Sequence, residues 1–181
     1  MGNPFLLKKI MEGDIDAYSV VYKEYYRKLY NYGHKFSSDT ALIEDAIQEV
    51  FFDLWNRKEK LNNIESFNSY IYSSFRYTLM KKLKDMKKLS FREEPGEDGE
   101  FEFSAESVMI EKEKNAEDEK SLELAYKKLT PRQYEAIFLR YYEQLSYEEV
   151  ARVLKISIKA TYKIMARSIS SLKDNIKLLL I

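Results

Sequence analysis

Two helix-start signals near the C-terminal end constrain this chain more than any other feature of its sequence. Thr130, Pro131 and Gln133 place an N-cap hydroxyl, a proline at the first helical position and a capping-box glutamine in order. Ser146 and Glu149 form a second capping box a few residues after the first helix should end. Two short helices are therefore predicted in succession, each with its own start.

A third helix is predicted after a very short connection. The tripeptide Lys155-Ile156-Ser157 is long enough only for a sharp turn, and its serine can cap a helix that begins at about Ile158. On a wheel of roughly 100° per residue, one face of this helix is apolar and consists of Ile158, Tyr162, Met165, Ala166, Ile169, Leu172 and Ile176. The opposite face carries Lys159, Lys163, Ile164 and Arg167, with Thr161 and Ser168 on its flank.

The segment from Leu129 to Lys173 thus reads as a helix-turn-helix with a basic reading face. Cations at successive turns can follow phosphates along a groove, Ile164 can meet a thymine methyl, and the two flanking hydroxyls can hydrogen-bond DNA. The same charges would also suit the solvated face of an ordinary helical bundle.

Composition limits the fold class and the chemistry. Only 5 glycines and 3 prolines occur in 181 residues, which predicts an all-α protein. Cysteine is absent and His34 is the single histidine, so disulfides, thiolate metal sites and histidine clusters are excluded and we expect no cofactor. No stretch approaches the roughly 20 apolar residues that span a bilayer, so we expect a soluble, cytoplasmic protein without membrane insertion.

The net charge of zero hides a strong segregation of sign along the chain. Residues 1–90 carry a net charge of +3, residues 91–119 carry −9, and residues 120–181 carry +6. Local rather than total charge governs contact with phosphates. The pattern predicts two basic helical domains joined by an acidic flexible linker that also holds enough apolar residues to dock on a partner.

The N-terminal domain should contain three helices. The first begins at about Asp14 and has an apolar stripe of Ile15, Tyr18, Val21, Tyr25, Leu29, Tyr32 and Phe36. The second has an apolar face of Ile43, Ala46, Ile47, Val50, Phe51, Leu54 and Trp55. Its other face is acidic and carries Glu44, Asp45, Gln48, Glu49 and Asp53.

The third helix, from about Ser66, is aromatic in its first half and basic in its second. The rings belong to Phe67, Tyr70, Tyr72, Phe75 and Tyr77, and the cations to Lys81, Lys82, Lys84, Lys87 and Lys88. Rings beside cations are typical of single-strand binding, because any base can stack on a ring. Aromatic residues at helical spacing are also usual in a core, and lysines near a helix C-terminus complement the helix dipole.

In order and across nearly the whole chain, these segments resemble the extracytoplasmic-function group of bacterial RNA polymerase sigma factors. The matching stretches are Glu44-Asp-Ala-Ile-Gln-Glu-Val-Phe-Phe-Asp-Leu-Trp55, the helix Phe67 to Lys84, and Leu129-Thr-Pro-Arg-Gln through Leu145-Ser-Tyr-Glu-Glu-Val-Ala to Ile156-Ser and Thr161-Tyr-Lys. The resemblance implies a region 2-like domain at 1–90, a linker at 91–119 and a region 4-like domain at 120–181. It also implies a non-catalytic factor that binds core RNA polymerase and promoter DNA and helps to melt the duplex.

The resemblance further implies which residues make these contacts. Docking on the polymerase maps to Asp45, Gln48, Glu49 and Phe51. Capture of the melted downstream promoter element maps to Asn62, Asn63, Tyr70, Arg76, Lys81 and Lys82, and the upstream element to the helix-turn-helix residues already given. Such factors are commonly held by an anti-sigma protein, so we expect one here.

The chain departs from the family pattern in two places. Lys155 stands where members often have glycine, and the second half of the recognition helix carries fewer cations than is common. Fewer phosphate contacts predict a shallower salt dependence of DNA binding. The slope of log affinity against log salt concentration falls by about one unit per missing contact. Two alternatives stay open: a transcription regulator that binds duplex DNA without polymerase, and an adaptor that keeps the fold but binds only protein.

Overall fold

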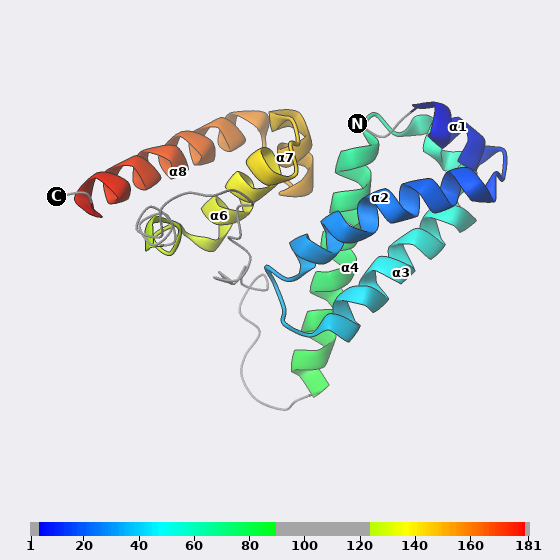
Figure 1. Ribbon diagram of the computed structural model, residues 1–181, viewed down its shortest axis with the longest axis horizontal. Helices are drawn as coiled ribbons and strands as arrows, with labels where there is room; N and C mark the ends of the chain where they lie inside the picture. The colour runs from blue at the N-terminus through cyan, green and yellow to red at the C-terminus, as the bar shows by residue number, and fades with distance from the viewer. Residues whose placement is uncertain (1–3, 90–123, 180–181) are drawn as a thin grey trace, which may run out of the picture. The chain divides into compact units, whose positions relative to one another are not determined.

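The computed structural model describes residues 4–89 and 124–179, and every element in these ranges is helical (Figure 1). The all-α prediction is confirmed. The chain divides into two compact units, Met1–Gly99 and Glu100–Ile181. The predicted acidic linker lies outside the described residues.

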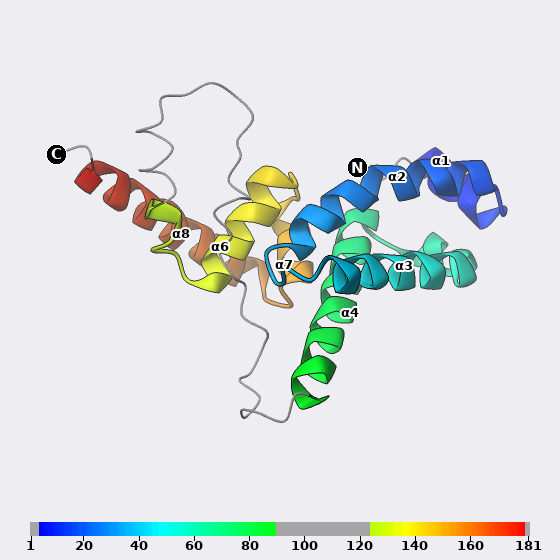
Figure 2. The same cartoon turned by 60° about the horizontal axis from the view of Figure 1, so that its bottom comes forward.

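The first unit is built from α1 (Pro4–Met11), α2 (Ile15–Gly33), α3 (Thr40–Asn56), the 3-10 helix η1 (Lys58–Asn63) and α4 (Phe67–Leu89). Helices α2 and α3 lie side by side, and α4 crosses both of them at a steep angle (Figures 1 and 2). Helix α1, which was not predicted, packs against α2 and η1. The three predicted helices are confirmed, and two short elements, α1 and η1, are added.

Local capping chemistry sets the starts of α2 and α3. The Asp14 carboxylate accepts hydrogen bonds from the backbone N–H groups of Asp16 and Ala17, both at 2.9 Å. Asp39 accepts from the N–H of Leu42 at 3.1 Å. Each aspartate therefore satisfies amides that a helix N-terminus leaves without partners.

Gly33, the last residue of α2, packs tightly against both α3 and α4. A Cβ atom at this position would lie 2.7 Å from Cγ2 of Ile43 and 3.0 Å from Cζ of Phe75. Both neighbours are fully buried. The glycine is therefore required by close packing in the core of the unit.

The second unit contains α6 (Pro131–Ile137), a π-helical continuation η3 (Phe138–Tyr142), α7 (Tyr147–Val153) and α8 (Ile158–Leu179). Both predicted capping boxes are present at the starts of α6 and α7. Ser157 Oγ accepts from the N–H of Ala160 at 3.1 Å, which caps α8 as predicted. Helices α6 and α7 both pack against α8.

The sharp turn between α7 and α8 depends on a left-handed residue. Lys155 has a φ of 51°, and its N–H donates to the Arg152 carbonyl at 3.2 Å. The N–H of Ile156 donates to the Ala151 carbonyl at 3.0 Å, which completes a Schellman motif. Glycine would adopt this conformation without steric cost.

No helix within the described residues is both long enough and apolar enough to cross a bilayer.

Candidate functional site

Three cations lie along the exposed face of α8. Lys159, Lys163 and Arg167 follow one another at four-residue steps, and all three are exposed. Such a row can follow phosphates along a groove. Their placement on the surface agrees with the sequence prediction.

The predicted apolar stripe of α8 is wrong in phase. Met165 is buried as predicted, but Tyr162 is 52% exposed and Ile158 is 45% exposed. Ala166 is also exposed, and Ile164, predicted for the reading face, is half-buried. The buried stripe is therefore rotated away from Tyr162 and towards the small hydroxyl residues.

Those hydroxyl residues, Thr161 and Ser168, are fully buried, so their predicted role as flanking DNA contacts is wrong. Thr161 Oγ1 donates to the Ser157 carbonyl at 3.2 Å, and Ser168 Oγ donates to the Ile164 carbonyl at 2.8 Å. The hydroxyls are satisfied by their own helix backbone, which lets short side chains face the core. Tyr162 and Ala166 join the exposed basic face instead.

Tyr162 is held in place by an aromatic stack. Its ring lies parallel to that of Tyr147, with the centroids 4.4 Å apart and the planes at 16°. The Arg140 guanidinium lies over the Tyr147 ring, 5.0 Å from its centroid, and Arg140 Nη1 donates to the Leu145 carbonyl at 2.9 Å. The stack joins the end of η3, the start of α7 and the first turns of α8.

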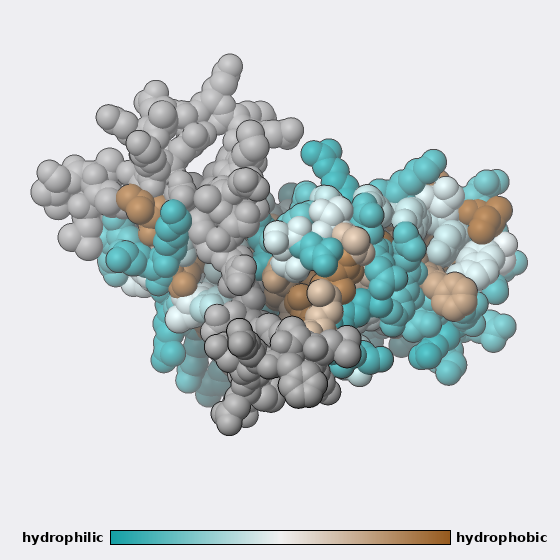
Figure 3. All heavy atoms as spheres, turned by 90° about the horizontal axis from the view of Figure 1, so that it is seen from below, coloured by the Kyte–Doolittle hydropathy of each residue, from teal (hydrophilic) through white to brown (hydrophobic). Residues whose placement is uncertain are grey.

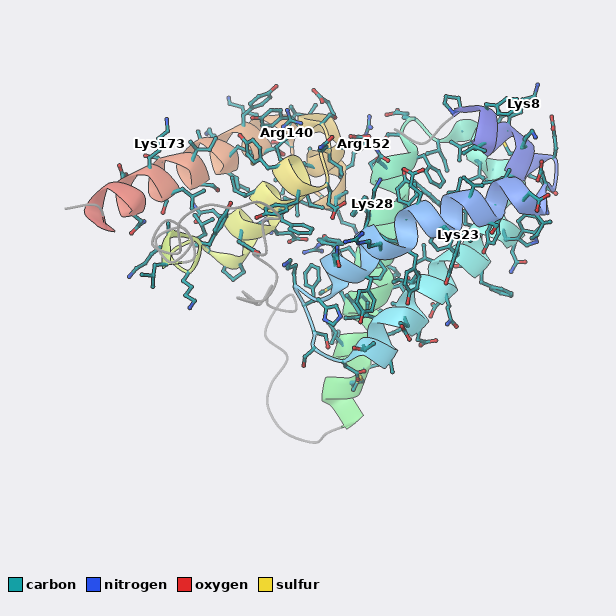
Figure 4. The ribbon with its side chains drawn as sticks, viewed as in Figure 1. Lys8, Lys23, Lys28, Arg140, Arg152 and Lys173 are labelled. Carbon is teal, nitrogen blue, oxygen red and sulfur yellow. The ribbon has the colours of Figure 1, made fainter. Side chains whose placement is uncertain are left out.

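Further cations surround the turn that precedes α8. Arg152 on α7 and Lys155 in the turn are exposed, and Arg132 is exposed while its Nη2 donates to the Leu154 carbonyl at 3.0 Å. Figure 4 labels Arg140, Arg152 and Lys173, which belong to three successive segments of this unit. The predicted basic surface did not include these cations. Their closeness in sequence to the predicted turn could have indicated that they lie beside the start of α8.

The acidic face of α3 borders a hollow in the first unit. The hollow has a volume of about 580 Å³ and is lined by Ile15, Tyr18, Tyr22, Asp45, Gln48, Glu49, Phe51, Phe52 and Trp55. Asp45, Gln48 and Glu49 are exposed. Figure 3 shows brown hydrophobic side chains among teal ones at the end of this unit where α1, α2 and α3 meet. Acidic and aromatic groups therefore share one accessible surface, which we call the α2–α3 groove.

Phe51 is a core residue, so its predicted role as a docking residue is wrong. It is 1% exposed and packs edge-on against Tyr18 and Tyr22, with ring centroids 6.1 Å and 4.8 Å away. Its neighbour Phe52 is 65% exposed at the groove. Successive side chains on a helix point about 100° apart, so Phe52 faces outward where Phe51 faces the core.

Aromatic side chains form a ladder along α2 at four-residue intervals. Adjacent centroids in this ladder lie 4.5–6.5 Å apart, and its members are Tyr18, Tyr22, Tyr26, Tyr30 and His34. The Tyr26 hydroxyl donates to Glu44 Oε1 at 2.8 Å, and this hydrogen bond raises the pKa of Tyr26 to about 12. The ladder runs from the α2–α3 groove towards the C-terminal end of α2.

Lys82 on α4 connects the predicted docking and DNA-binding residues. Its Nζ lies 2.6 Å from Asp45 Oδ2 and 2.6 Å from Glu49 Oε2. Hydrogen bonds to Asp45 and Glu49 raise the pKa of Lys82 above its ordinary value. The structure thus joins the docking candidates to a downstream-element candidate, which were predicted as separate groups.

The remaining downstream candidates do not cluster, since they are distributed over η1 and successive turns of α4. Asn62 and Asn63 are exposed at the end of η1, Tyr70 and Arg76 are half-buried on α4, and Lys81 is exposed further along. Burial raises the pKa of Tyr70. The charge of Arg57, next to η1, lowers this pKa by a smaller amount.

Most of the aromatic half of α4 serves the core. Phe67, Tyr72 and Phe75 are buried, which confirms core packing for these rings, whereas Tyr77 is 61% exposed. Only Tyr77 and the partly exposed Tyr70 can offer a ring face or edge to a base. Within residues 4–89 and 124–179, no three His, Asp or Glu side chains gather as a metal site would require.

Comparisons with known proteins agree with this arrangement. The family Sigma-70 region 2 matches residues 21–88, and the family Sigma-70 region 4 matches residues 119–172. The RNA polymerase sigma factor YlaC of Bacillus subtilis (strain 168) is 22% identical over 160 residues, which make up 88% of this chain and 92% of that protein.

Two solved structures share the fold. CnrH, determined in complex with the cytosolic domain of CnrY, has a TM-score of 0.60 at 17% identity, covering 98% of this chain and 99% of that chain. The sigma factor RpoE from Bartonella quintana, determined in complex with the anti-sigma factor NepR, has a TM-score of 0.54 at 17% identity, covering 83% and 91%. With both regions matched in order on two helical units, the chain belongs to the sigma-70 family of RNA polymerase sigma factors, in the extracytoplasmic-function group.

Proposed function

We propose that this chain docks on core RNA polymerase through its first unit, reads the upstream promoter element through its second, and directs melting and initiation. The observation that carries the proposal is the separation of two chemically opposite surfaces on two units. The α2–α3 groove is acidic and aromatic, whereas the exposed face of α8 is basic. Residues 1–90 serve docking and the downstream element, residues 120–181 serve the upstream element, and residues 91–119 link them.

Polymerase docking is assigned to Asp45, Gln48, Glu49 and Phe52. Exposed carboxylates attract cationic groups of a partner, and an exposed ring beside them supplies apolar area that becomes buried on binding. Phe52 takes the place that the family resemblance implied for Phe51, because Phe52 is the exposed one of the two. A basic, partly apolar surface on the polymerase fits this groove.

Reading of the upstream element is assigned to Lys159, Tyr162, Lys163 and Arg167. The cations bind phosphates or base edges, and the stacked Tyr162 ring offers a rigid apolar edge to the major groove. Base contacts by a recognition helix come mainly from its N-terminal turns. Tyr162 lies in the second turn of α8.

Capture of the downstream element is assigned to Asn62, Asn63, Tyr70, Arg76 and Lys81. Amide side chains can hydrogen-bond an exposed base, and a ring can stack on it. Holding an unstacked base offsets the cost of opening the duplex, which is a few kcal/mol per flipped base. Lys82, whose ammonium is paired with Asp45 and Glu49, belongs to this set when it is released from them.

An anti-sigma protein is proposed as a further partner. CnrH and RpoE, which share this fold, were both solved in complex with a second protein, and NepR is an anti-sigma factor. The α2–α3 groove is the surface on which such a protein would exclude polymerase. Initiation by this chain takes place in the cytoplasm, where the polymerase is, and the chain has no catalytic activity of its own.

Reconstituted transcription tests the proposal and separates its alternatives. A sigma factor makes purified core polymerase initiate at a specific promoter, and the core enzyme alone does not. A regulator of another kind binds promoter fragments without polymerase, and an adaptor binds protein and supports neither reaction. Specific initiation in the first assay is the expected result, and its absence with a formed polymerase complex would overturn the proposal.

A further inference from the structure

Lys82 lies between the proposed docking surface and the proposed DNA-binding residues. Its Nζ lies 2.6 Å from both Asp45 Oδ2 and Glu49 Oε2, and these two carboxylates are part of the proposed docking surface. Its helix, α4, also carries the proposed DNA-binding residues Arg76 and Lys81. One ammonium group therefore stands between the two surfaces that the initiation factor uses.

Exposure differs between the lysine and its partners. The Lys82 side chain is 22% exposed, whereas those of Asp45 and Glu49 are 64% and 44% exposed. A cationic partner can therefore reach both carboxylates while Lys82 is bound to them. Lys82 itself is mostly covered, so its ammonium is less available to a phosphate while the two ion pairs last.

Carboxylates one helical turn apart repel each other, and a single ammonium between them offsets that repulsion. Cationic groups of the polymerase that bind the same carboxylates would weaken the hold on Lys82. The flexible four-carbon stem of lysine then allows its ammonium to turn towards another anion. The most abundant anion near α4 in an initiation complex is the DNA backbone.

We propose that Lys82 couples polymerase docking to DNA capture: Asp45 and Glu49 hold it in the free factor, and docking releases it to a phosphate of the downstream element. This inference rests on the proposed function of the two surfaces. Coupling of this kind is reciprocal, so DNA bound by Lys82 also frees the carboxylates for polymerase. Partly exposed ion pairs are weak, so the coupling should amount to about three- to fivefold in affinity.

The first experiment measures binding of the full-length free chain to a fluorescent single-stranded oligonucleotide of the downstream element. The double variant Asp45→Asn with Glu49→Gln frees Lys82 and should bind about three- to fivefold more tightly than wild type. Adding Lys82→Met should abolish this gain. Asp53→Asn, which removes an exposed charge one turn further along α3 without touching Lys82, controls for general loss of negative charge.

A gain that persists in the triple variant would overturn the inference, because it would come from the altered net charge alone. No gain in the double variant would overturn it as well. Lys82→Met keeps the apolar stem of the side chain, and thermal unfolding of each variant confirms that the first unit is intact.

The second experiment measures the salt dependence of DNA binding by the free chain and by the reconstituted polymerase complex. Lys82→Met should lower the slope by about one log-log unit in the complex and leave it unchanged in the free chain. Lys81→Met, at the exposed neighbouring position, should lower the slope in both. Equal effects of Lys82→Met in both states, or no effect in the complex, would overturn the inference. Failure of the wild-type complex to initiate would instead overturn the proposed function.

Discussion

The rings of Tyr147 and Tyr162 lie parallel with their centroids 4.4 Å apart, which fixes the orientation of Tyr162 on the exposed face of α8. A ring held in this way loses little conformational freedom when it contacts DNA. The contact joins the first residue of α7 to the second turn of α8. It therefore links α7 directly to α8, the helix proposed to read the upstream element.

Tyr162 should read a thymine methyl group in the upstream element. Replacing the contacted thymine by uracil removes only that methyl group and should weaken wild-type binding about three- to tenfold. Tyr162→Ala should bind both templates equally weakly, and Tyr162→Phe should keep the discrimination. Equal loss on uracil substitution in wild type and Tyr162→Ala, measured by competition binding of the polymerase complex, would contradict this role.

Charge reversal on the basic face should abolish promoter-dependent initiation. Lys163→Glu and Arg167→Glu each turn an attraction to phosphate into a repulsion and should reduce specific transcripts about tenfold or more. Polymerase binding should be unchanged, because it is assigned to the other unit. Lys128→Glu, an exposed reversal outside α8, serves as the control. Normal initiation by both α8 variants would remove the reading-face assignment.

Reversing two charges in the α2–α3 groove should weaken association with core polymerase. Asp45→Lys with Glu49→Lys replaces attraction to basic groups by repulsion and also sets two new cations beside Lys82. Pull-down or fluorescence titration with the core enzyme measures the loss. Association at the wild-type level would count against the docking surface.

Adjacent phenylalanines on α3 should behave in opposite ways. Phe51→Ala empties a fully buried site and should lower the free energy of unfolding by about 3–5 kcal/mol. Phe52→Ala removes a ring that is 65% exposed, so it should leave stability nearly unchanged and weaken polymerase binding. Chemical denaturation and the binding titration together test the pair. The docking role of Phe52 fails if the titration shows no loss.

Lys155 should respond to substitution through its left-handed backbone. Lys155→Gly relieves the steric cost of a φ of 51° and should raise the free energy of unfolding by about 0.5–1 kcal/mol. Lys155→Ala keeps a Cβ atom and should give no such gain, which separates backbone strain from loss of charge. Denaturant titration of both variants measures the difference, and equal stability of the two would contradict the explanation.

Local chemistry made the helix starts predictable. The capping boxes at Thr130 and Ser146 and the caps at Asp14 and Ser157 need only neighbours within three residues, so the sequence contains the whole interaction. The phase of α8 was not predictable in the same way. An amphipathic wheel assigns hydroxyl residues to the polar side, whereas Thr161 satisfies its hydroxyl on the helix backbone and packs inward.

Interactions between distant residues explain the other differences. Lys82 and Asp45 are 37 positions apart, and no spacing rule connects them. The full burial of Phe51 and the exposure of Phe52 depend on how α3 packs against the tyrosines of α2, which tertiary packing decides. Sequence pattern thus predicted an acidic face on α3 and a basic face on α8, and packing selected which side chains reach them.

Permanganate footprinting of unpaired thymines tests the central claim most directly, because it detects promoter opening itself. Core polymerase reconstituted with this chain should make thymines of the downstream element reactive on promoter DNA, and Arg167→Glu should prevent this. Neither core polymerase alone nor this chain alone should have the effect. A stable complex of the chain with core polymerase that leaves every promoter thymine unreactive would contradict the account.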